Sequence, residues 1–477
     1  ALGITLLNAL RSAYPIGYAG LYTLMFESIA ENGFRLPESL PFYNVQPIPF
    51  AYPPLPFYIA AFLTKIFELT PLTYLRFLPL FLAMGSVVVF YFLLSEICQD
   101  HRIAALGGVL FLSMPEIAHY DFSAAGMVRG FALLFLLLFW LCGWKASRTD
   151  TPRIRDWLLA AVFLGLTGLS HLSYALFAGF GVITMVLFSP LSWKNKLLLW
   201  IRIGLVTGCL MAPWLITVVS RWGFGILFAP LGSHDNFALS QGLYFLVRIL
   251  TLNPPWILIV FLVGFLNTLL QKRWWWGVWF LITLIGIGES NRFLLLLLIV
   301  MTAEFLVFLL AKVDEEVKLK PGQRWIPITT AALLIIALSV PNFVTLFQQQ
   351  RTSLTDAFLE MGTWLRENTP EESSVLFIQG DHALSEWLPY FSHRVPETGH
   401  WGTEWLGTYA EESEQQFLAR GIAVNDDYAL LQEGIAAYQW SPDYTVLPAD
   451  SSVTAQFLAD HASIVFQNNN YIIVKMP

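Results

Sequence analysis

The stretch Phe293–Leu310 reads FLLLLLIVMTAEFLVFLL, a nearly unbroken apolar run. Comparable runs occupy Phe131–Trp140 and Leu176–Phe188. A helix needs about 20 apolar residues to cross a bilayer, and several of these runs approach that length. The sequence therefore predicts a polytopic α-helical membrane protein.

The composition of the whole chain supports this prediction. Hydrophobic residues make up 56% of the 477 residues and charged residues only 13%, whereas soluble chains carry about 25% charged residues. This excludes an ordinary soluble enzyme, a disordered chain and a disulfide scaffold. The runs are continuous and do not alternate with a period of two, which excludes a transmembrane β-barrel. The net charge of -7 gives no reason to expect a nucleic-acid partner.

The negative charge is concentrated in the last part of the chain. Residues 351–477 contain 18 of the 34 acids and 5 of the 27 bases, a balance of -13, which leaves +6 for residues 1–350. We therefore expect two domains in different surroundings: a transmembrane domain over residues 1–347 and a soluble exterior α/β domain over residues 348–477.

The pattern of apolar runs predicts about eleven transmembrane helices. The first is a remnant, and we expect an N-terminal part to be missing before Arg11. The expected spans are 1–10, 78–97, 104–118, 126–144, 156–170, 172–189, 197–218, 254–271, 275–290, 293–312 and 325–347.

Lysine and arginine in the short connectors predict the orientation, because positive residues are retained on the cytoplasmic side. Every second connector is basic, the clearest being Lys145–Arg155 and the pair Lys272 and Arg273. The loops 11–77 and 116–125 and the polar tail then face outward. No Asn-x-Ser/Thr sequon occurs, which favours a bacterial plasma (inner) membrane and a periplasmic tail.

One apolar segment has to be kept out of the membrane to preserve this scheme. If Tyr52–Leu69 crossed the bilayer, every later loop would invert and Lys145–Arg155 would lie outside. We interpret the segment as an interfacial or re-entrant helix. The first exterior loop then holds two juxtamembrane helices, near residues 20–32 and 54–68.

The tail has the pattern of a small α/β domain. Thr355–Glu367 predicts a helix with Thr355 as its N-cap, and Ser374–Ile378 predicts a strand. Val453–His461 could form another helix. The last two predicted strands flank Asn468–Asn470 as a hairpin, and they cover Ser463–Phe466 and Tyr471–Lys475.

This layout resembles that of GT-C-type glycosyltransferases, a superfamily of polyprenyl-phosphate-sugar-dependent membrane enzymes that includes protein mannosyltransferases and aminoarabinose transferases. The resemblance rests on the long first loop, the YPPL tract at Tyr52–Leu55, an acidic second exterior loop and the exterior tail. The local matches are ENGFRLPESLPFY (31–43), AYPPLPFYIAAFL (51–63), WLRENTPEESSVLF (364–377) and GTEWLG (402–407).

The resemblance implies sugar transfer from a lipid-phosphate carrier to an exterior acceptor, with an exterior carboxylate as base or metal ligand. Related chains carry the first catalytic Asp in a stretch resembling P-x-G-x-D-x-G-x-H/Y. This chain reads PIGYAGLY over Pro15–Tyr22, with Tyr18 and Ala19 where the Asp would stand. The nearest acid is Glu27, either a catalytic base or a solvated carboxylate on an interfacial helix.

The second exterior loop supplies the first-choice acid, Asp121. The segment PEIAHYDFSAAGMVRG (115–130) places it near Glu116 and His119 and before Arg129. An ionisable residue at the edge of the hydrocarbon core is costly to desolvate and tends to be functional or paired. Asp121 therefore lies in the active site or forms an ion pair with Arg129. With His119 it could hold a divalent cation, Mg²⁺ or Mn²⁺, although one His beside one Asp is a weak ligand set.

Two further residues are candidates for binding the substrate. Arg292 follows Glu289 in an exterior turn, GESNRF. The resemblance implies that an Arg near this point can face the lipid phosphate, and a guanidinium suits that bidentate contact; the alternative is a salt bridge with Glu289. His171 interrupts an apolar run at an outer helix end, where it either packs or binds substrate. In the tail, Trp387, Trp401 and Trp405 could stack on a sugar, form the core of the small domain or dock that domain on the membrane helices.

The sequence thus predicts a membrane glycosyltransferase that uses a lipid-linked sugar donor among membrane lipids, with Asp121 as its acidic centre and an acceptor that the sequence does not name. The first alternative is a catalytically inactive relative that serves as a structural subunit with partner chains in a membrane complex. Tyr18 and Ala19 motivate it. A transporter is disfavoured because the spans hold few charges and no internal repeat occurs.

Overall fold

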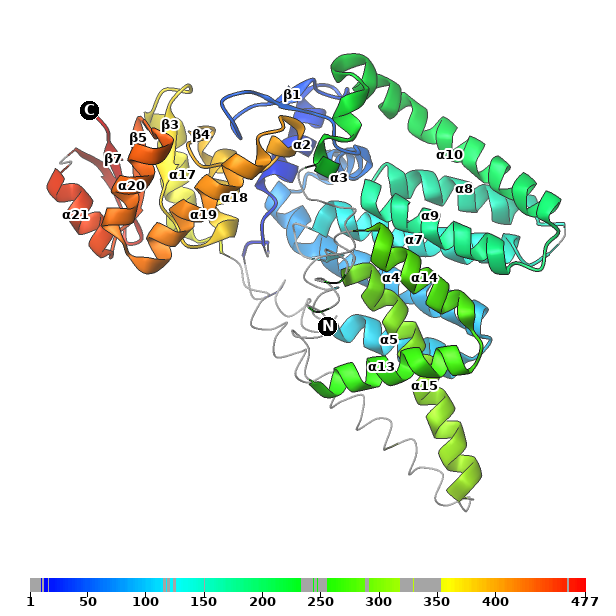
Figure 1. Ribbon diagram of the computed structural model, residues 1–477. Coiled ribbons are helices and arrows are strands. Elements are labelled where there is room, and N and C mark those ends of the chain that lie inside the picture. Colours follow the sequence, from blue (N-terminus) through cyan, green and yellow to red (C-terminus); the bar gives the residue numbers. More distant parts are fainter. Residues whose placement is uncertain are drawn as a thin grey trace. The chain divides into compact units, whose positions relative to one another are not determined.

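A computed structural model describes most of the chain, and it is mostly helical (Figure 1). The described residues are 10, 13–15, 17–114, 117, 121–122, 126–149, 151–232, 243, 247, 255–287, 291–317, 329, 353–460 and 463–477.

The chain divides into two compact units. The first contains Ala1–Arg11, Phe77–Leu215 and His234–Gln350, and the second contains Ser12–Arg76, Ile216–Ser233 and Arg351–Pro477. The contacts thus group the loop expected at residues 11–77 with the tail, whereas the sequence assigned it to the domain 1–347.

The helices of the first unit coincide with the predicted spans. Each of the nine spans between residues 78 and 312 corresponds to one helix, and the spans 1–10 and 325–347 lie outside the described residues except for residues 10 and 329. The helices are α4 (Pro71–Cys98), α5 (His101–Ser113), α7 (Met127–Ala146), α8 (Ile154–Gly168), α9 (Leu172–Phe188), α10 (Trp193–Trp222), α13 (Pro255–Leu270), α14 (Trp274–Gly286) and α15 (Asn291–Val317).

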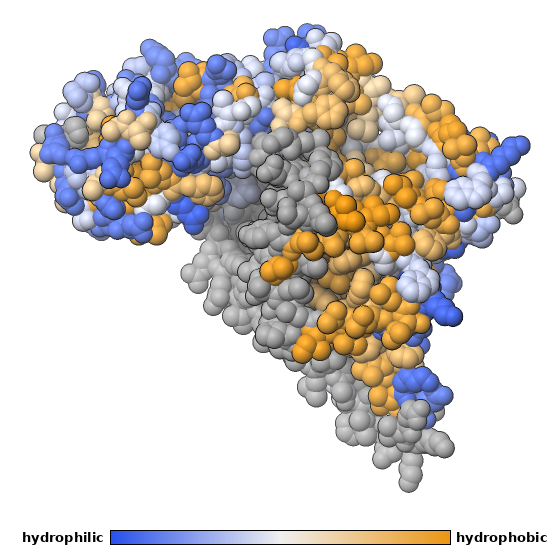
Figure 2. All heavy atoms as spheres, in the orientation of Figure 1, coloured by the Kyte–Doolittle hydropathy of each residue, from blue (hydrophilic) through white to orange (hydrophobic). Residues whose placement is uncertain are grey.

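Several of these helices are long and apolar enough to cross a membrane. Within the described part of the chain, four meet that standard: Pro71–Cys98, Met127–Ala146, Trp193–Trp222 and Arg292–Val313. A helix satisfies its own backbone hydrogen bonds, as a segment in lipid must. Shorter apolar helices accompany them, and Figure 2 shows apolar side chains over much of the surface formed by the helices of the first unit. The chain is therefore a membrane protein, and the total of eleven spans stays a prediction.

The membrane helices pack around α7, α9 and α15. Helix α7 contacts α8 and α9, α9 contacts α14, and α15 contacts α5 and α13. Glycine permits a close approach at Gly181 on α9, where a Cβ atom would lie 2.7 Å from Trp140 on α7 and 2.7 Å from Trp279 on α14. The small residue is thus required by the packing of three helices.

The second unit begins with residues 12–76, which we call the first loop. It contains α2 (Gly20–Glu31) and α3 (Leu55–Ile66), joined through two short antiparallel strands, β1 (Ser39–Leu40) and β2 (Ile48–Pro49). Both predicted juxtamembrane helices are therefore present as helices. Helix α3 has 12 residues, too few to cross a bilayer, which agrees with the interfacial interpretation of Tyr52–Leu69. Residues 216–233 add η2 (Phe224–Leu227) and α11 (Ala229–Gly232).

The tail folds around one mixed sheet. Its strands are ordered β4-β3-β5-β7-β6, with β3 parallel to β4 and β5 and with antiparallel pairing elsewhere. The strands are β3 (Ser374–Phe377), β4 (Val395–Pro396), β5 (Tyr444–Pro448), β6 (Ile464–Gln467) and β7 (Tyr471–Lys475). The helices are α17 (Asp356–Asn368), α18 (His382–Ser392), η4 (Thr403–Trp405), α19 (Tyr409–Asn425), α20 (Tyr428–Tyr438) and α21 (Ser452–Asp460).

The local signals in the tail predict several of these elements. Thr355 caps α17 by accepting a hydrogen bond from the Phe358 N–H at 3.2 Å. In the hairpin between β6 and β7, the side chain of Asn468 accepts hydrogen bonds from the N–H groups of Asn470 and Tyr471. The sequence pattern predicts none of the helices α18, α19 and α20 and neither of the strands β4 and β5.

Candidate active site

Asp121 lies in the segment between α5 and α7, where it is 2% exposed. Its carboxylate accepts a hydrogen bond from the Tyr174 hydroxyl on α9. The backbone of α7 approaches it closely, because a Cβ atom on Gly130 would lie 2.6 Å from the carbonyl oxygen of Asp121. Helices α7 and α9 thus fix the position of the acid.

Two arginines face the same group. Arg292, 3% exposed, holds its guanidinium carbon 5.3 Å from the ring centroid of Tyr174 and 5.0 Å from that of Phe293. Both Arg292 and Arg129 act electrostatically on Asp121. The structure therefore brings together three of the predicted residues, Asp121, Arg129 and Arg292.

His171 completes this group, which we call the Asp121 cluster: Asp121, Arg129, His171, Tyr174 and Arg292. His171 is the N-cap of α9, and its Nδ1 accepts a hydrogen bond from the Ser173 N–H at 3.3 Å. Its ring lies 5.3 Å from that of Tyr174, and both arginines act on it electrostatically. The cap fixes the direction in which the imidazole points.

The electrostatics of the Asp121 cluster favour an anion. Burial raises the pKa of Asp121 to about 6, although Arg292, the Tyr174 hydroxyl and Arg129 each lower it. Two guanidinium groups then face one carboxylate. Arg129, Tyr174 and Arg292 each stand in the first turn of a helix, so three N-termini with partial positive charge add to the same field.

Tyr174 is the member of this cluster that sequence reasoning missed. It follows His171 by three residues, a spacing that places both side chains on one face of a helix. The spacing of His171 and Tyr174 was therefore visible in the sequence, but it indicates a site only once the structure places Asp121 beside Tyr174. His119, Glu116 and Glu289 lie outside the described residues.

Glu27 lies in the second unit, on α2. Its Oε1 accepts a hydrogen bond from the Tyr390 hydroxyl on α18 at 3.2 Å. Burial and the neighbouring Glu31 raise the pKa of Glu27, and the Tyr390 hydroxyl lowers it. The side chain is therefore a partly buried contact between two helices and not a fully solvated carboxylate.

A second carboxylate in this unit was missed altogether. Glu386 on α18 is 2% exposed, and it accepts hydrogen bonds from the N–H groups of Gly20 at 2.6 Å and Leu21 at 2.8 Å. Burial raises its pKa to about 7, opposed by the amides of residues 19 to 21. The carboxylate thus lies at the start of α2, next to Tyr18 and Ala19.

The tryptophans of the tail serve packing. Trp387 is completely buried, and its indole N–H donates to the Gly17 carbonyl at 3.0 Å. Trp401 stacks on His400 with ring centroids 4.3 Å apart. Trp405 contacts the edge of Tyr52 at 5.3 Å. Trp387 is thus part of a core, whereas Trp401 and Trp405 are partly exposed and make contacts with neighbouring rings.

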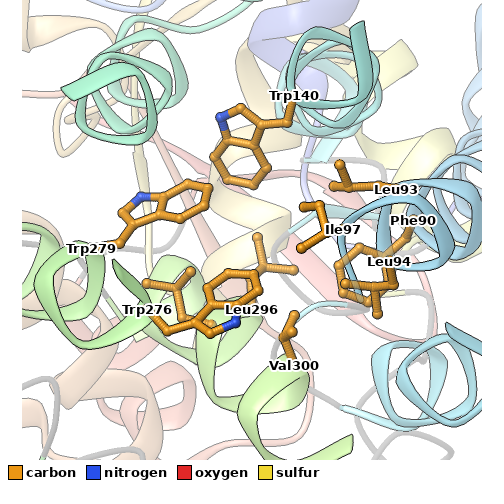
Figure 3. Close-up of a pocket in the computed structure, with 10 residues that line it drawn as sticks. Phe90, Leu93, Leu94, Ile97, Trp140, Trp276, Trp279, Leu296 and Val300 are labelled. Carbon is orange, nitrogen blue, oxygen red and sulfur yellow. The ribbon is translucent and has the colours of Figure 1, made fainter. Parts of the chain in front are cut away.

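An apolar cavity of about 20 Å³ lies elsewhere in the first unit (Figure 3). Its walls include Trp140 from α7, Trp276 and Trp279 from α14 and Val300 from α15, and no polar surface lines it. This volume holds little more than one water molecule. The cavity is therefore too small and too apolar for a sugar.

The sequence has no match among family models or among curated proteins. Its fold does match solved structures. The archaeal oligosaccharyltransferase AglB from Archaeoglobus fulgidus, in complex with an inhibitory peptide and a dolichol-phosphate, superposes with a TM-score of 0.61 at 14% identity, over 94% of this chain and 69% of that chain.

ArnT from Cupriavidus metallidurans covers the chain more fully. Its apo form gives a TM-score of 0.59 at 13% identity, over 99% of this chain and 96% of that chain. The form bound to undecaprenyl phosphate gives 0.55 at 14% identity. AglB and ArnT are both GT-C glycosyltransferases. The chain therefore has the GT-C fold, as its sequence predicts.

Proposed function

We propose that this chain is a membrane glycosyltransferase that transfers a sugar from a polyprenyl-phosphate carrier to an acceptor at the exterior, periplasmic face of the plasma membrane. The observation that carries the proposal is the Asp121 cluster, a buried carboxylate facing two guanidinium groups in a GT-C fold. The predicted orientation, with eleven spans and the tail outside, belongs to the same proposal.

The reaction requires the two kinds of group that this cluster offers. The acceptor hydroxyl or amine attacks the anomeric carbon while the bond to the lipid phosphate breaks, and the acceptor loses a proton. Asp121, ionised above about pH 6, takes that proton as a general base. Arg129 and Arg292 neutralise the charge that stays on the departing phosphate. Tyr174 and the His171 cap hold the acid and the helix terminus in place.

The solved structures support this choice of donor. AglB is described with a dolichol-phosphate and ArnT with undecaprenyl phosphate, and both ligands are polyprenyl phosphates. We propose a ligand of the same class for this chain, with its phosphate between Arg129 and Arg292.

The sequence leaves a divalent cation at Asp121 as a possibility, and an oligosaccharyltransferase of Archaeoglobus fulgidus has been described in complex with Zn and sulfate. In the described part of the chain no three His, Cys, Asp or Glu side chains gather into a metal site. Two neighbours of Asp121 there, Arg129 and Arg292, are cationic, which disfavours a metal ion. Mg²⁺ or Mn²⁺ would need further ligands from residues such as Glu116 and His119, which lie outside the described residues. The proposed reaction does not require a metal ion.

The second candidate function is that of an inactive structural subunit. It is favoured by Tyr18 and Ala19 in place of the expected acid and by the position of Glu27, which is bonded to Tyr390. Such a subunit would form a stable complex with other membrane chains and would not turn over a donor.

A donor panel distinguishes the two. Purified protein in liposomes is incubated with radiolabelled polyprenyl-phosphate sugars and a membrane extract that supplies acceptors, and the label released from the lipid phase is counted. We expect release with at least one donor. Arg292→Gln should weaken binding of the matching polyprenyl phosphate about tenfold or more, since a desolvated charge contact to phosphate is lost.

The control for that variant is Arg102→Gln, which removes an exposed arginine paired with Asp100 and should leave both readouts unchanged. The glycosyltransferase proposal would be overturned if no donor released its label and the protein associated stoichiometrically with other membrane chains. The structural subunit would then be the supported function.

A further inference from the structure

Helix α18 contacts the first loop through a series of side-chain hydrogen bonds. Glu386 binds the N–H groups of Gly20 and Leu21. Trp387 binds the Gly17 carbonyl, and Tyr390 binds Glu27. These contacts join residues more than 360 positions apart in the sequence, and all lie within the second unit.

Gly20, the first residue of α2, packs closely against Tyr43 and Glu386. A Cβ atom on Gly20 would lie 2.7 Å from the Tyr43 hydroxyl and 2.8 Å from the carbonyl oxygen of Glu386. The Tyr43 hydroxyl itself donates to that carbonyl at 3.0 Å. A larger side chain at Gly20 and a truncated side chain at Glu386 therefore disturb the same contact, the one between α18 and the start of α2.

We propose that Glu386 is a positioning residue, whose carboxylate anchors the start of α2 and so holds the first loop in the conformation needed for sugar transfer. The N-terminal amides of a helix have no partner within the helix, and Ala19 has no side-chain oxygen with which to cap α2. A carboxylate from α18 supplies that cap with both oxygens. A negative charge also suits the positive end of the helix dipole.

The place of this anchor gives it a role in the reaction. The resemblance to GT-C enzymes implies an acid within residues 15–22, and this chain has Tyr18 and Ala19 there. Glu386 brings a carboxylate to the neighbouring amides, and both of its oxygens accept hydrogen bonds from them, so its role is to hold the backbone. The positioning role rests on the proposed function, whereas the anchoring contact does not.

The test measures backbone exchange and turnover on the full chain in nanodiscs. Hydrogen exchange followed by mass spectrometry reports the amides of residues 17–27 in the wild type, Glu386→Gln, Glu386→Ala and Gly20→Ala. The matched control is Glu433→Gln, which changes an exposed acid on α20. Turnover and binding of the polyprenyl phosphate are measured on the same samples.

We expect exchange at residues 17–27 to quicken at least tenfold in Glu386→Ala and Gly20→Ala, by less in Glu386→Gln, which keeps one acceptor oxygen, and not at all in Glu433→Gln. The sheet of residues 374–475 should keep its protection. With an active donor, kcat should fall about tenfold or more in Glu386→Ala while donor binding stays within twofold.

Unchanged exchange at residues 17–27 would overturn the anchor, and so would an equal loss of protection in the sheet, which indicates a general folding contact. Faster exchange with unchanged kcat would overturn the positioning role. If no donor is turned over by the wild type, the proposed function and its positioning role fail, while the exchange data still decide whether the anchor exists.

Discussion

Asp121 carries a carboxylate whose ionisation is opposed by burial and favoured by Arg292, the Tyr174 hydroxyl and Arg129. Burial is the larger effect, so the pKa rises from an ordinary value near 4 to about 6. A general base must be ionised, and its activity is therefore lost as the pH falls through 6.

The first prediction concerns this pH dependence. We expect kcat/KM for sugar transfer to rise with pH along a limb with an apparent pKa of about 6, because the proton on Asp121 must leave before it can accept another. The profile is measured between pH 4.5 and 8.5 with a saturating acceptor. A flat profile over this range, or a limb near pH 4, would show that Asp121 is not the base.

The second prediction tests the Tyr174 hydroxyl. Tyr174→Phe removes a donor that stabilises the ionised carboxylate, so the pKa of Asp121 should rise and the acidic limb should move to higher pH. Activity should fall severalfold at pH 6.5 and far less at pH 8.5. The matched control, Tyr58→Phe on α3, should leave the limb in place. An unshifted limb in Tyr174→Phe would contradict the role of this hydroxyl.

At the scale of single residues, the sequence singles out four members of the Asp121 cluster, and it singles out neither Tyr174 nor Glu386. Asp121, Arg129, His171 and Arg292 stand out because ionisable residues are rare at the edges of apolar runs. Tyr174 and Glu386 carry no such signal. A tyrosine is common at a membrane edge. Glu386 is one of 18 acids in the tail, and it is distinguished only by contacts such as its hydrogen bond with the Leu21 N–H, 365 residues away in the sequence.

Among the elements, α9 shows how a glycine determines helix packing. Gly181 faces Trp140 and Trp279 at distances that exclude a methyl group, whereas Gly179, two residues earlier, has open space beside it. Gly181 and Gly179 therefore form a matched pair: both lie on α9, but only Gly181 is in a tightly packed environment.

The third prediction follows from this pair. Gly181→Ala overpacks the junction of α7, α9 and α14, at a cost of about 1–3 kcal/mol, and should lower the midpoint of thermal unfolding in detergent. Gly179→Ala should leave the midpoint unchanged or raise it, because alanine favours a helix over glycine by about 0.5–1 kcal/mol. Equal midpoints for the two variants would contradict the packing described for α9.

The sequence predicts elements best where one physical signal dominates. Continuous apolar runs identify the helices of the first unit, and capping and turn residues identify α17 and the β6–β7 hairpin. Helices α18, α19 and α20 mix polar and apolar residues, and β4 has only two residues. Their form depends on the sheet and on the first loop, which no local pattern reveals.

At the scale of the whole molecule, the two units have opposite charge. The basic connectors belong to the membrane helices, and the acidic residues belong mostly to the tail. The sequence predicts a basic membrane part and an acidic tail, but it does not predict that the first loop packs with the tail. That loop joins the tail through contacts between residues far apart in the chain, and chain order alone assigned it to the membrane domain.

The fourth prediction concerns orientation. In a chain whose Cys98, Cys142 and Cys209 are replaced by Ala, Glu433→Cys in the tail should react with a membrane-impermeant maleimide on intact spheroplasts. Thr149→Cys, in the basic connector between α7 and α8, should react only after permeabilisation. Both positions are exposed, so access to the residue does not limit either reaction. The reverse labelling pattern would invert the topology and remove Asp121 from the outer face.

The transfer rate of Asp121→Asn relative to the wild type tests the proposed reaction most directly. It is measured at pH 7.5 with the active donor, beside Asp156→Asn, which changes another aspartate of the membrane unit paired with Arg155 at 3.5 Å. Removing a general base costs about 10²–10⁴-fold in rate. We predict a loss in that range for Asp121→Asn and a rate within twofold of the wild type for Asp156→Asn. A rate for Asp121→Asn within twofold of the wild type would contradict the assignment of the chemistry to the Asp121 cluster.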